Sequence, residues 1–190
     1  MREISCVTSN PHKFAEFSRI LSLYSFSIAQ LNRPKIEIQA DSLEEIAVYS
    51  IDQISDTYCF LEDAGIFIDI LNGFPGPYSA YVFRTLGCVG ILQLMKNHEN
   101  RLAQFVSVIV FRDPAGKKTI FRGETIGTIA FEECGTGGFG FDPVFIPEGT
   151  NKTYAEISPS EKDTISHRGK AARDLTAFLN MQNANEDYNL

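Results

Sequence analysis

Residues 57–87 read TYCFLEDAGIFIDILNGFPGPYSAYVFRTLG, and the rest of the chain is organised around this stretch. The run from Tyr58 to Leu61, near its start, is short, apolar and rich in aromatic side chains, which predicts a buried strand. Glu62 and Asp63 follow where we expect the strand to end, and the chain then breaks at the Gly/Pro-rich residues 72–77. Two carboxylates beside such a loop can hold a divalent metal or activate a water. The alternative is a solvated junction between strand and turn.

Composition limits the class of protein. A chain of 190 residues suits a single domain or one domain with two lobes, and its hydrophobic fraction of 44% can form a full core. No apolar run reaches about 18 residues, and the first residues lack a signal-peptide pattern, so we expect no membrane association and a cytoplasmic location. The net charge of −7 disfavours a nucleic-acid partner. Four scattered cysteines without a CxxC pair predict buried free thiols and no zinc site.

The N-terminal segment predicts an anion-binding turn. Residues 3–8 are typical of a strand, residues 9–12 of a turn, and residues 13–24 of a helix with apolar side chains at helical spacing. This arrangement points helix N-terminal amides at an anion. His12 and Lys13 stand at the helix start, where the helix dipole disfavours a cation. A bound phosphate would remove this conflict; alternatively, Lys13 forms an ordinary surface pair with Glu16.

The remaining segments alternate strands and helices. Residues 26–39 predict one or two strands interrupted by Pro34, and Asp41 or Ser42 can cap a helix from Leu43 to about residue 54. Residues 79–96 predict a helix, with Gly87 and Gly90 in its middle. Residues 104–111 and 117–131 predict a long antiparallel hairpin around a turn that contains proline and glycine.

Residues 135–140 read GTGGFG and fit G-x-G-x-x-G letter for letter. A dinucleotide-binding fingerprint must open a helix after a strand, whereas Asp142, Pro143 and strand-like residues follow here. We therefore reject that interpretation. The glycines either let the backbone approach a ligand beside Phe139 and Phe141, or they serve a loop with unusual dihedral angles.

The C-terminal part contains two helix starts. Residues 158–161 (SPSE) combine a serine cap, a proline and a glutamate, which predicts a helix start. A last helix is expected from Ser166, with His167 and Arg168 in its first turn, again the end that disfavours cations. Two basic helix starts invite an anionic ligand. We expect the tail of residues 181–190 to fray.

Six segments, in this order and spacing, resemble the inosine triphosphate pyrophosphatase family (Ham1-like, non-canonical purine NTP pyrophosphatases). They are TSNPHKFAE (8–16), EIQ (37–39), EDAG (62–65), FPGPYSA (74–80), GTGGFGFDP (135–143) and SHRGKA (166–171). The resemblance covers roughly residues 3–180, and the short connections are most similar to its archaeal branch. Each motif is weak alone, but the ordered set is specific.

The resemblance implies a fold and an activity. The fold is α/β: an elongated mixed β-sheet flanked by helices, forming two lobes with a nucleotide cleft between them. The activity is Mg²⁺-dependent hydrolysis of ITP, dITP and XTP to the nucleoside monophosphate and pyrophosphate, which keeps deaminated purines out of DNA and RNA. The family also implies a cytosolic homodimer.

The resemblance also implies residue roles. Asp63 is similar to the family's general base, which also contacts metal, and Glu37 is similar to its metal-ligating glutamate. Ala64 stands where the family usually has serine, so one hydroxyl contact to substrate is missing. The residues expected to bind substrate are Thr8, Ser9, Asn10, Pro11, His12, Lys13, Ala64, Phe139, Gly140, Phe141, Asp142, Lys162, His167 and Arg168.

Two other functions compete with this one. The chain could be a nucleotide-binding sensor that no longer hydrolyses, with Ala64 as its lesion, although a pure binder needs no general base. It could also be a phosphatase that releases orthophosphate from the same nucleotides. Selectivity for 6-oxo purines needs a donor at position 6, from His167, Arg168 or a backbone amide, because adenine presents its own N–H₂ donor there.

Overall fold

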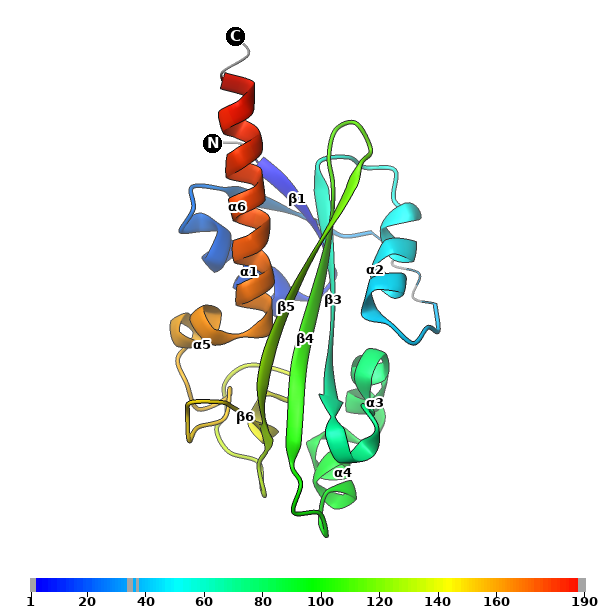
Figure 1. The fold of residues 1–190 in the computed structure, drawn as a ribbon, viewed down its shortest axis with the longest axis vertical. Coiled ribbons are helices and arrows are strands. Elements are labelled where there is room, and N and C mark those ends of the chain that lie inside the picture. The colour runs from blue at the N-terminus through cyan, green and yellow to red at the C-terminus, as the bar shows by residue number, and fades with distance from the viewer. Residues whose placement is uncertain (1–2, 34–35, 37, 188–190) are drawn as a thin grey trace.

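The structure is a computed structural model that describes residues 3–33, 36 and 38–187 (Figure 1). One mixed sheet has the strand order β2-β1-β3-β4-β5-β6; β1 is parallel to β2 and β3, and the other pairs are antiparallel. The strands are β1 (Glu3–Val7), β2 (Ser27–Leu31), β3 (Cys59–Ile68), β4 (Leu102–Arg112), β5 (Lys118–Ile129) and β6 (Phe145–Pro147). The helices are α1 (Pro11–Ser22), α2 (Leu43–Asp52), α3 (Ser79–Thr85), α4 (Gly87–Leu94), α5 (Pro159–Ile165) and α6 (His167–Asp187). Three short 3₁₀ turns are η1 (Asp69–Leu71), η2 (Gly76–Tyr78) and η3 (Asp142–Val144).

β3 is one strand of ten residues, so Glu62 and Asp63 lie inside it and not at its end. The sequence-based expectation of a strand ending at Leu61 is wrong because β4 pairs with β3 along its whole length, through Gly65 to Ile68. Successive side chains of a strand point to opposite faces, so the two carboxylates diverge. They cannot act as the adjacent pair that the sequence suggested.

The face of the sheet that carries Glu62 is apolar at both ends and polar in the middle. At one end, side chains including Phe60 and Phe111 pack with α1 and α6. At the other end, a second cluster including Ile66 and Phe105 packs with α3, α4 and the segment after β6. Glu62 and Ser107 lie between these two clusters. The opposite face packs its own apolar cluster against α2.

Two glycines bring other elements close to the sheet. A Cβ at Gly123 of β5 would lie 2.1 Å from the carbonyl oxygen of His167, so glycine is required where α6 begins on the sheet. A Cβ at Gly65 of β3 would lie 2.3 Å from the carbonyl oxygen of Gly76, in the turn that precedes α3. Glycine at these positions lets α6 and α3 start directly against the long strands.

Most other sequence-based elements are confirmed, and one further element differs from the expectation. The hairpin is β4–β5, Ser42 and Ser158 cap α2 and α5, and the four cysteines are free, three of them buried. The helix expected over residues 79–96 is two helices, because Gly87 has a φ of +64°. Of the tail of residues 181–190 that we expect to fray, residues 181–187 belong to α6. Among residues 3–33, 36 and 38–187, no helix has the length and apolar character needed to cross a membrane.

Candidate active site

A cavity of about 470 Å³ opens where the pairing of β1 with β3 ends, at Val7 and Leu61. In open α/β sheets, ligands bind in the crevice beyond the carboxyl ends of the strands. The lining comes from the turn into α1, the middle of β3, α3, the loop of residues 139–142 and the first turn of α6. Its expected members are Thr8, Ser9, Asn10, His12, Lys13, Asp63, Ala64, Phe139, Gly140, Phe141, Asp142, His167 and Arg168.

The turn into α1 is built by side-chain hydrogen bonds. The Oδ1 of Asn10 accepts from the backbone N–H groups of His12 (2.9 Å) and Lys13 (3.3 Å), which caps the helix. The Oγ1 of Thr8 accepts from the N–H of Asn10 at 3.1 Å. These bonds hold the turn of residues 8–10 against the cavity and leave the Asn10 amide group able to donate.

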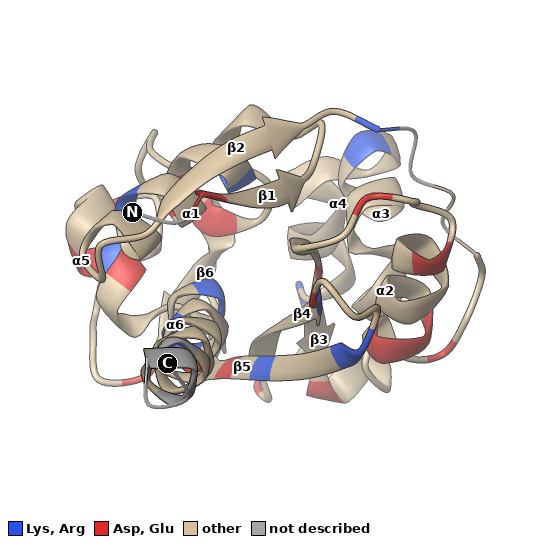
Figure 2. Ribbon diagram, turned by 90° about the horizontal axis from the view of Figure 1, so that it is seen from above, with Lys and Arg blue, Asp and Glu red and all other residues tan. Residues whose placement is uncertain are grey.

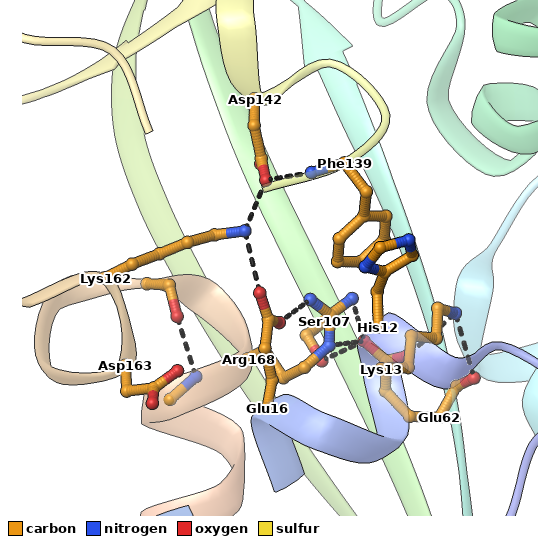
Figure 3. A network of polar contacts seen from close by, with 12 residues as sticks. His12, Lys13, Glu16, Glu62, Ser107, Phe139, Asp142, Lys162, Asp163 and Arg168 are labelled. Carbon is orange, nitrogen blue, oxygen red and sulfur yellow. Dashed lines mark hydrogen bonds and ion pairs between the residues drawn. The ribbon is translucent and has the colours of Figure 1, made fainter. Parts of the chain in front are cut away.

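Glu62 is the acceptor on which both basic helix starts converge (Figure 3). Its Oε1 accepts from Ser107 Oγ at 2.8 Å and lies 3.0 Å from Arg168 Nη2, while its Oε2 lies 2.8 Å from Lys13 Nζ. Burial alone would raise the pKa of Glu62, but the charges of Arg168 and Lys13 outweigh it and hold that pKa well below its ordinary value. Glu62 therefore stays ionised.

A second part of the same network joins α1, α5 and the loop of residues 139–142. Glu16 contacts Arg168 Nη1 at 2.5 Å and Lys162 Nζ at 2.8 Å. Lys162 also contacts Asp142, whose Oδ2 accepts from the N–H of Phe139 at 2.8 Å. Burial raises the pKa of Asp142, and the charge of Lys162 opposes that rise. Lys162 thus holds the Phe139 loop against α1 through Asp142.

This network changes three sequence-based expectations. Lys13 pairs with Glu62 and not with Glu16, so the surface pair at helical spacing is wrong. The dipole conflict at both helix starts is offset by a buried carboxylate of the protein itself. Lys162 is buried behind the cavity and does not line it. With its carboxylates ionised, the network balances three cations against three anions: Lys13, Lys162 and Arg168 against Glu16, Glu62 and Asp142.

His167 presents a neutral ring to the cavity. It is buried and stacks on Phe105, with ring centroids 4.6 Å apart. Burial lowers the pKa of His167 well below its ordinary value, and the charge of Arg168 lowers it further. Its Nδ1 is buried without a hydrogen-bond partner among residues 3–33, 36 and 38–187. An unpaired buried nitrogen beside a cavity is suited to a ligand.

Aromatic rings form another wall of the cavity. Phe139 stacks with His12 at a centroid distance of 5.2 Å, which links the start of α1 to the glycine-rich loop. Phe141 contacts Phe83 of α3 edge to face. The loop of residues 135–141 opens no α-helix and leads through η3 into β6, so rejection of the dinucleotide fingerprint is confirmed. These rings give the cavity apolar surfaces against which a flat ligand can pack.

Asp63 reaches the cavity from the other face of β3, away from the buried network. It is 9% exposed, and its Oδ1 accepts from the N–H of Ala64 at 3.0 Å. No group of three or more His, Cys, Asp or Glu side chains that could hold a metal exists in the described part of the chain. Glu37, the other expected ligand, lies outside the described residues. One carboxylate suits Mg²⁺, which usually takes one or two carboxylates and completes its shell with substrate phosphates and water.

Several residues at the site were not expected from the sequence. Pro11, which was expected to bind substrate, does not line the cavity. Glu16 and Ser107 belong to the ion network, but their partners Arg168 and Glu62 are distant in the sequence. No local sequence motif therefore marks either residue. Glu62, which the sequence indicated only as a possible metal-holding or water-activating carboxylate, also lines the cavity. The lining residues not expected from the sequence are Val7, Arg33, Ser79, Ala80, Phe83, Arg84 and Phe105.

Comparison with known proteins identifies the family. The family model described as the Ham1 family matches residues 4–178. A dITP/XTP pyrophosphatase of Thermococcus kodakarensis is 47% identical over 179 residues, covering 93% of this chain and 96% of that protein. One of Pyrococcus horikoshii is 45% identical over 189 residues, covering 98% and 100%. The solved structure of the Staphylococcus aureus Ham1 protein superposes with a TM-score of 0.82 at 29% identity, covering 95% of this chain and 100% of that one. The expected α/β fold is therefore confirmed, and the chain belongs to the Ham1 family.

Proposed function

We propose that this protein hydrolyses the non-canonical purine nucleoside triphosphates ITP, dITP and XTP to the monophosphate and pyrophosphate. The relatives named dITP/XTP pyrophosphatase support this activity. The observation that carries it is a single cavity that joins a charge-balanced pocket of aromatic and hydrogen-bonding groups to a carboxylate, Asp63. The charge-balanced pocket suits an uncharged purine base, and the carboxylate of Asp63 can assist hydrolysis.

The base is proposed to lie beside Phe139, with its edge toward the first turn of α6. A neutral His167 can donate from one ring nitrogen to a 6-oxo group, and Arg168 and backbone N–H groups are further donors. Adenine would place its own N–H₂ donor against these donors, at a cost of roughly 1–3 kcal/mol for the unpaired group. Guanine shares the 6-oxo group, so its rejection needs a second contact at C2.

Asp63 is proposed to act as the general base. It would take a proton from the water that attacks the α-phosphorus, while the bond from that phosphorus to the bridging oxygen breaks and pyrophosphate leaves. The N–H of Ala64 holds the Asp63 carboxylate in place. Alanine at position 64 offers no hydroxyl to the substrate, so substrate contacts there are limited to the backbone.

Mg²⁺ is the proposed cofactor. Asp63 and Glu37 would hold it together with substrate phosphates. When bound, the ion would neutralise phosphate charge and lower the pKa of a coordinated water.

We also propose a homodimer in the cytoplasm. Exposed apolar side chains on α3 and α4 support self-association. They include Tyr81, which is 61% exposed, and Val89, also 61% exposed. The unpaired thiols fit a reducing compartment, and the net charge of −7 disfavours nucleic acid as a partner.

Product analysis tests the function directly. Incubation with ITP, and separately with ATP and GTP, with and without Mg²⁺, should yield IMP and pyrophosphate from ITP only when metal is present. ATP and GTP should react far more slowly. IDP with orthophosphate would replace the proposal by the phosphatase alternative. Tight ITP binding without turnover would favour the sensor, and Ala64→Ser would then be the first reversion to test.

Gly123→Ala tests whether the first turn of α6 must lie against β5. The new methyl would meet the His167 carbonyl, so α6 should shift, with a loss of about 1–3 kcal/mol in the free energy of unfolding. IMP affinity should fall as well, because His167 and Arg168 move with the helix. The matched control is Gly116→Ala, in open space with a φ of +85°, which should cost roughly 1–2 kcal/mol. Calorimetric titration with IMP would contradict this account if both variants bound equally well.

A further inference from the structure

The buried ion network of Lys13, Lys162, Arg168, Glu16, Glu62 and Asp142 leaves little unpaired positive charge for a polyphosphate. Lys13 and Arg168 line the cavity, but each is already paired with a buried carboxylate, at 2.8 Å and 3.0 Å from Glu62. Arg33 also lines the cavity and is paired with Asp56 at 3.3 Å. A pyrophosphate group bound in water-excluding surroundings needs cations or donors that are not already neutralised.

Arg84 is the lining cation whose charge is not matched within residues 3–33, 36 and 38–187. No carboxylate of these residues lies within ion-pair distance of its guanidinium. Its guanidinium carbon lies 6.0 Å from the centroid of the Tyr81 ring. Its guanidinium is thus available to a ligand in the cavity.

The structure holds α3 firmly beside the reacting carboxylate. Ser79 Oγ accepts from the N–H of Ile66 at 2.9 Å and donates to the carbonyl of Gly76 at 2.6 Å, which fixes the start of α3 on β3. Ser79, Ala80, Phe83 and Arg84 all line the cavity, and their spacing places them on one side of the helix. Arg84 therefore projects from a short helix whose start is anchored three residues along β3 from Asp63.

Arg84 on α3 lies apart from His167 and Arg168, the proposed base-binding groups at the start of α6. In Figure 1, α6 lies along the upper part of β4 and β5, whereas α3 lies beside the lower part of β3. Figure 2 shows from above that the positions of Lys and Arg are spread over several elements. His167 and Arg168 hold the α6 side of the cavity, so a nucleotide that spans it extends its phosphates toward α3.

We infer that Arg84 is a further substrate-binding residue, which holds the leaving pyrophosphate part of the triphosphate. The guanidinium matches phosphate oxygens with two parallel N–H donors, which fixes orientation as well as charge. A purely structural alternative is that Arg84 stabilises the C-terminal end of α3 through the helix dipole. Lysine would keep the charge at the helix end but lose the paired donors.

This inference rests on the proposed function. Binding of the two products, measured separately, distinguishes a failure of the inference from a failure of the proposed function. Isothermal titration with pyrophosphate plus Mg²⁺, and separately with IMP, would be made on the wild type, Arg84→Gln, Arg84→Lys and the control Lys96→Gln. Lys96 is exposed and lies outside the cavity. Its change to glutamine removes one positive charge, as Arg84→Gln does, so the two variants have the same net charge.

Arg84→Gln should weaken pyrophosphate binding by about 10- to 100-fold, with IMP binding unchanged. Arg84→Lys should also weaken it, by a smaller factor, and Lys96→Gln should match the wild type. Equal pyrophosphate binding by Arg84→Gln and Lys96→Gln would overturn the inference and leave the proposed function standing, as would a parallel loss of IMP binding. If the wild type bound neither product, the proposed function and the inference would fail together.

Discussion

Asp63→Asn should lower kcat for ITP hydrolysis by about 10²- to 10⁴-fold, because an amide cannot take the proton of the attacking water. Asparagine has nearly the same shape as aspartate. In the wild type, Oδ1 of Asp63 accepts from the N–H of Ala64 at 3.0 Å, and the amide oxygen of asparagine can still accept this hydrogen bond. IMP binding should therefore change little. The measurement is the steady-state rate of pyrophosphate release across a range of Mg²⁺ concentrations.

The dependence of the hydrolysis rate on Mg²⁺ concentration distinguishes the two roles proposed for Asp63, metal ligand and general base. A lost metal ligand shifts the Mg²⁺ concentration needed for half-maximal rate, whereas a lost general base lowers the rate at saturating metal. The matched control is Asp174→Asn, on the exposed side of α6, which should behave as the wild type. Recovery of the wild-type rate at high Mg²⁺ would assign Asp63 to metal binding alone.

Local sequence signals predicted the framework of the site well. Proline and glycine at a turn between two β-rich runs marked the β4–β5 hairpin, and serine caps marked the starts of α2 and α5. These features act within a few residues, so they are visible in the sequence. The turn from residue 8 to Lys13 and the loop of residues 139–142 also line one cavity, as the resemblance implied.

Long-range contacts explain what could not be predicted. Two charged residues followed by glycine are typical of a strand end, but pairing with β4 carries β3 through Gly65. The partners Lys13 and Glu62 are 49 residues apart, and Glu16 and Arg168 are 152 apart, so no local pattern joins them. No sequence signal marked Arg84 within the helix expected over residues 79–96, because its position at the cavity depends on how α3 is anchored on β3.

The remaining large prediction concerns the stability of the buried network. Glu62→Gln keeps the size of the side chain but removes one of three carboxylates that face three cations. Lys13 and Arg168 are then left with an unmatched buried charge, which typically costs about 3–5 kcal/mol. We expect the free energy of unfolding in urea at pH 7 to fall by that amount. The control is Glu44→Gln, whose partner Arg122 is at the surface, and it should lose about 1 kcal/mol or less.

The pH dependence of that loss identifies its electrostatic origin. The pKa of Glu62 in the folded protein is held below its ordinary value of about 4.3, so its contribution to stability is complete above that pH and disappears as the pH falls toward the folded-state pKa. The glutamine variant cannot titrate. The stability difference between wild type and Glu62→Gln should therefore be largest near pH 7 and narrow below about pH 4. A difference that stayed constant over this range would mean that glutamine disturbs packing, and the ion network would not be the source of the lost stability.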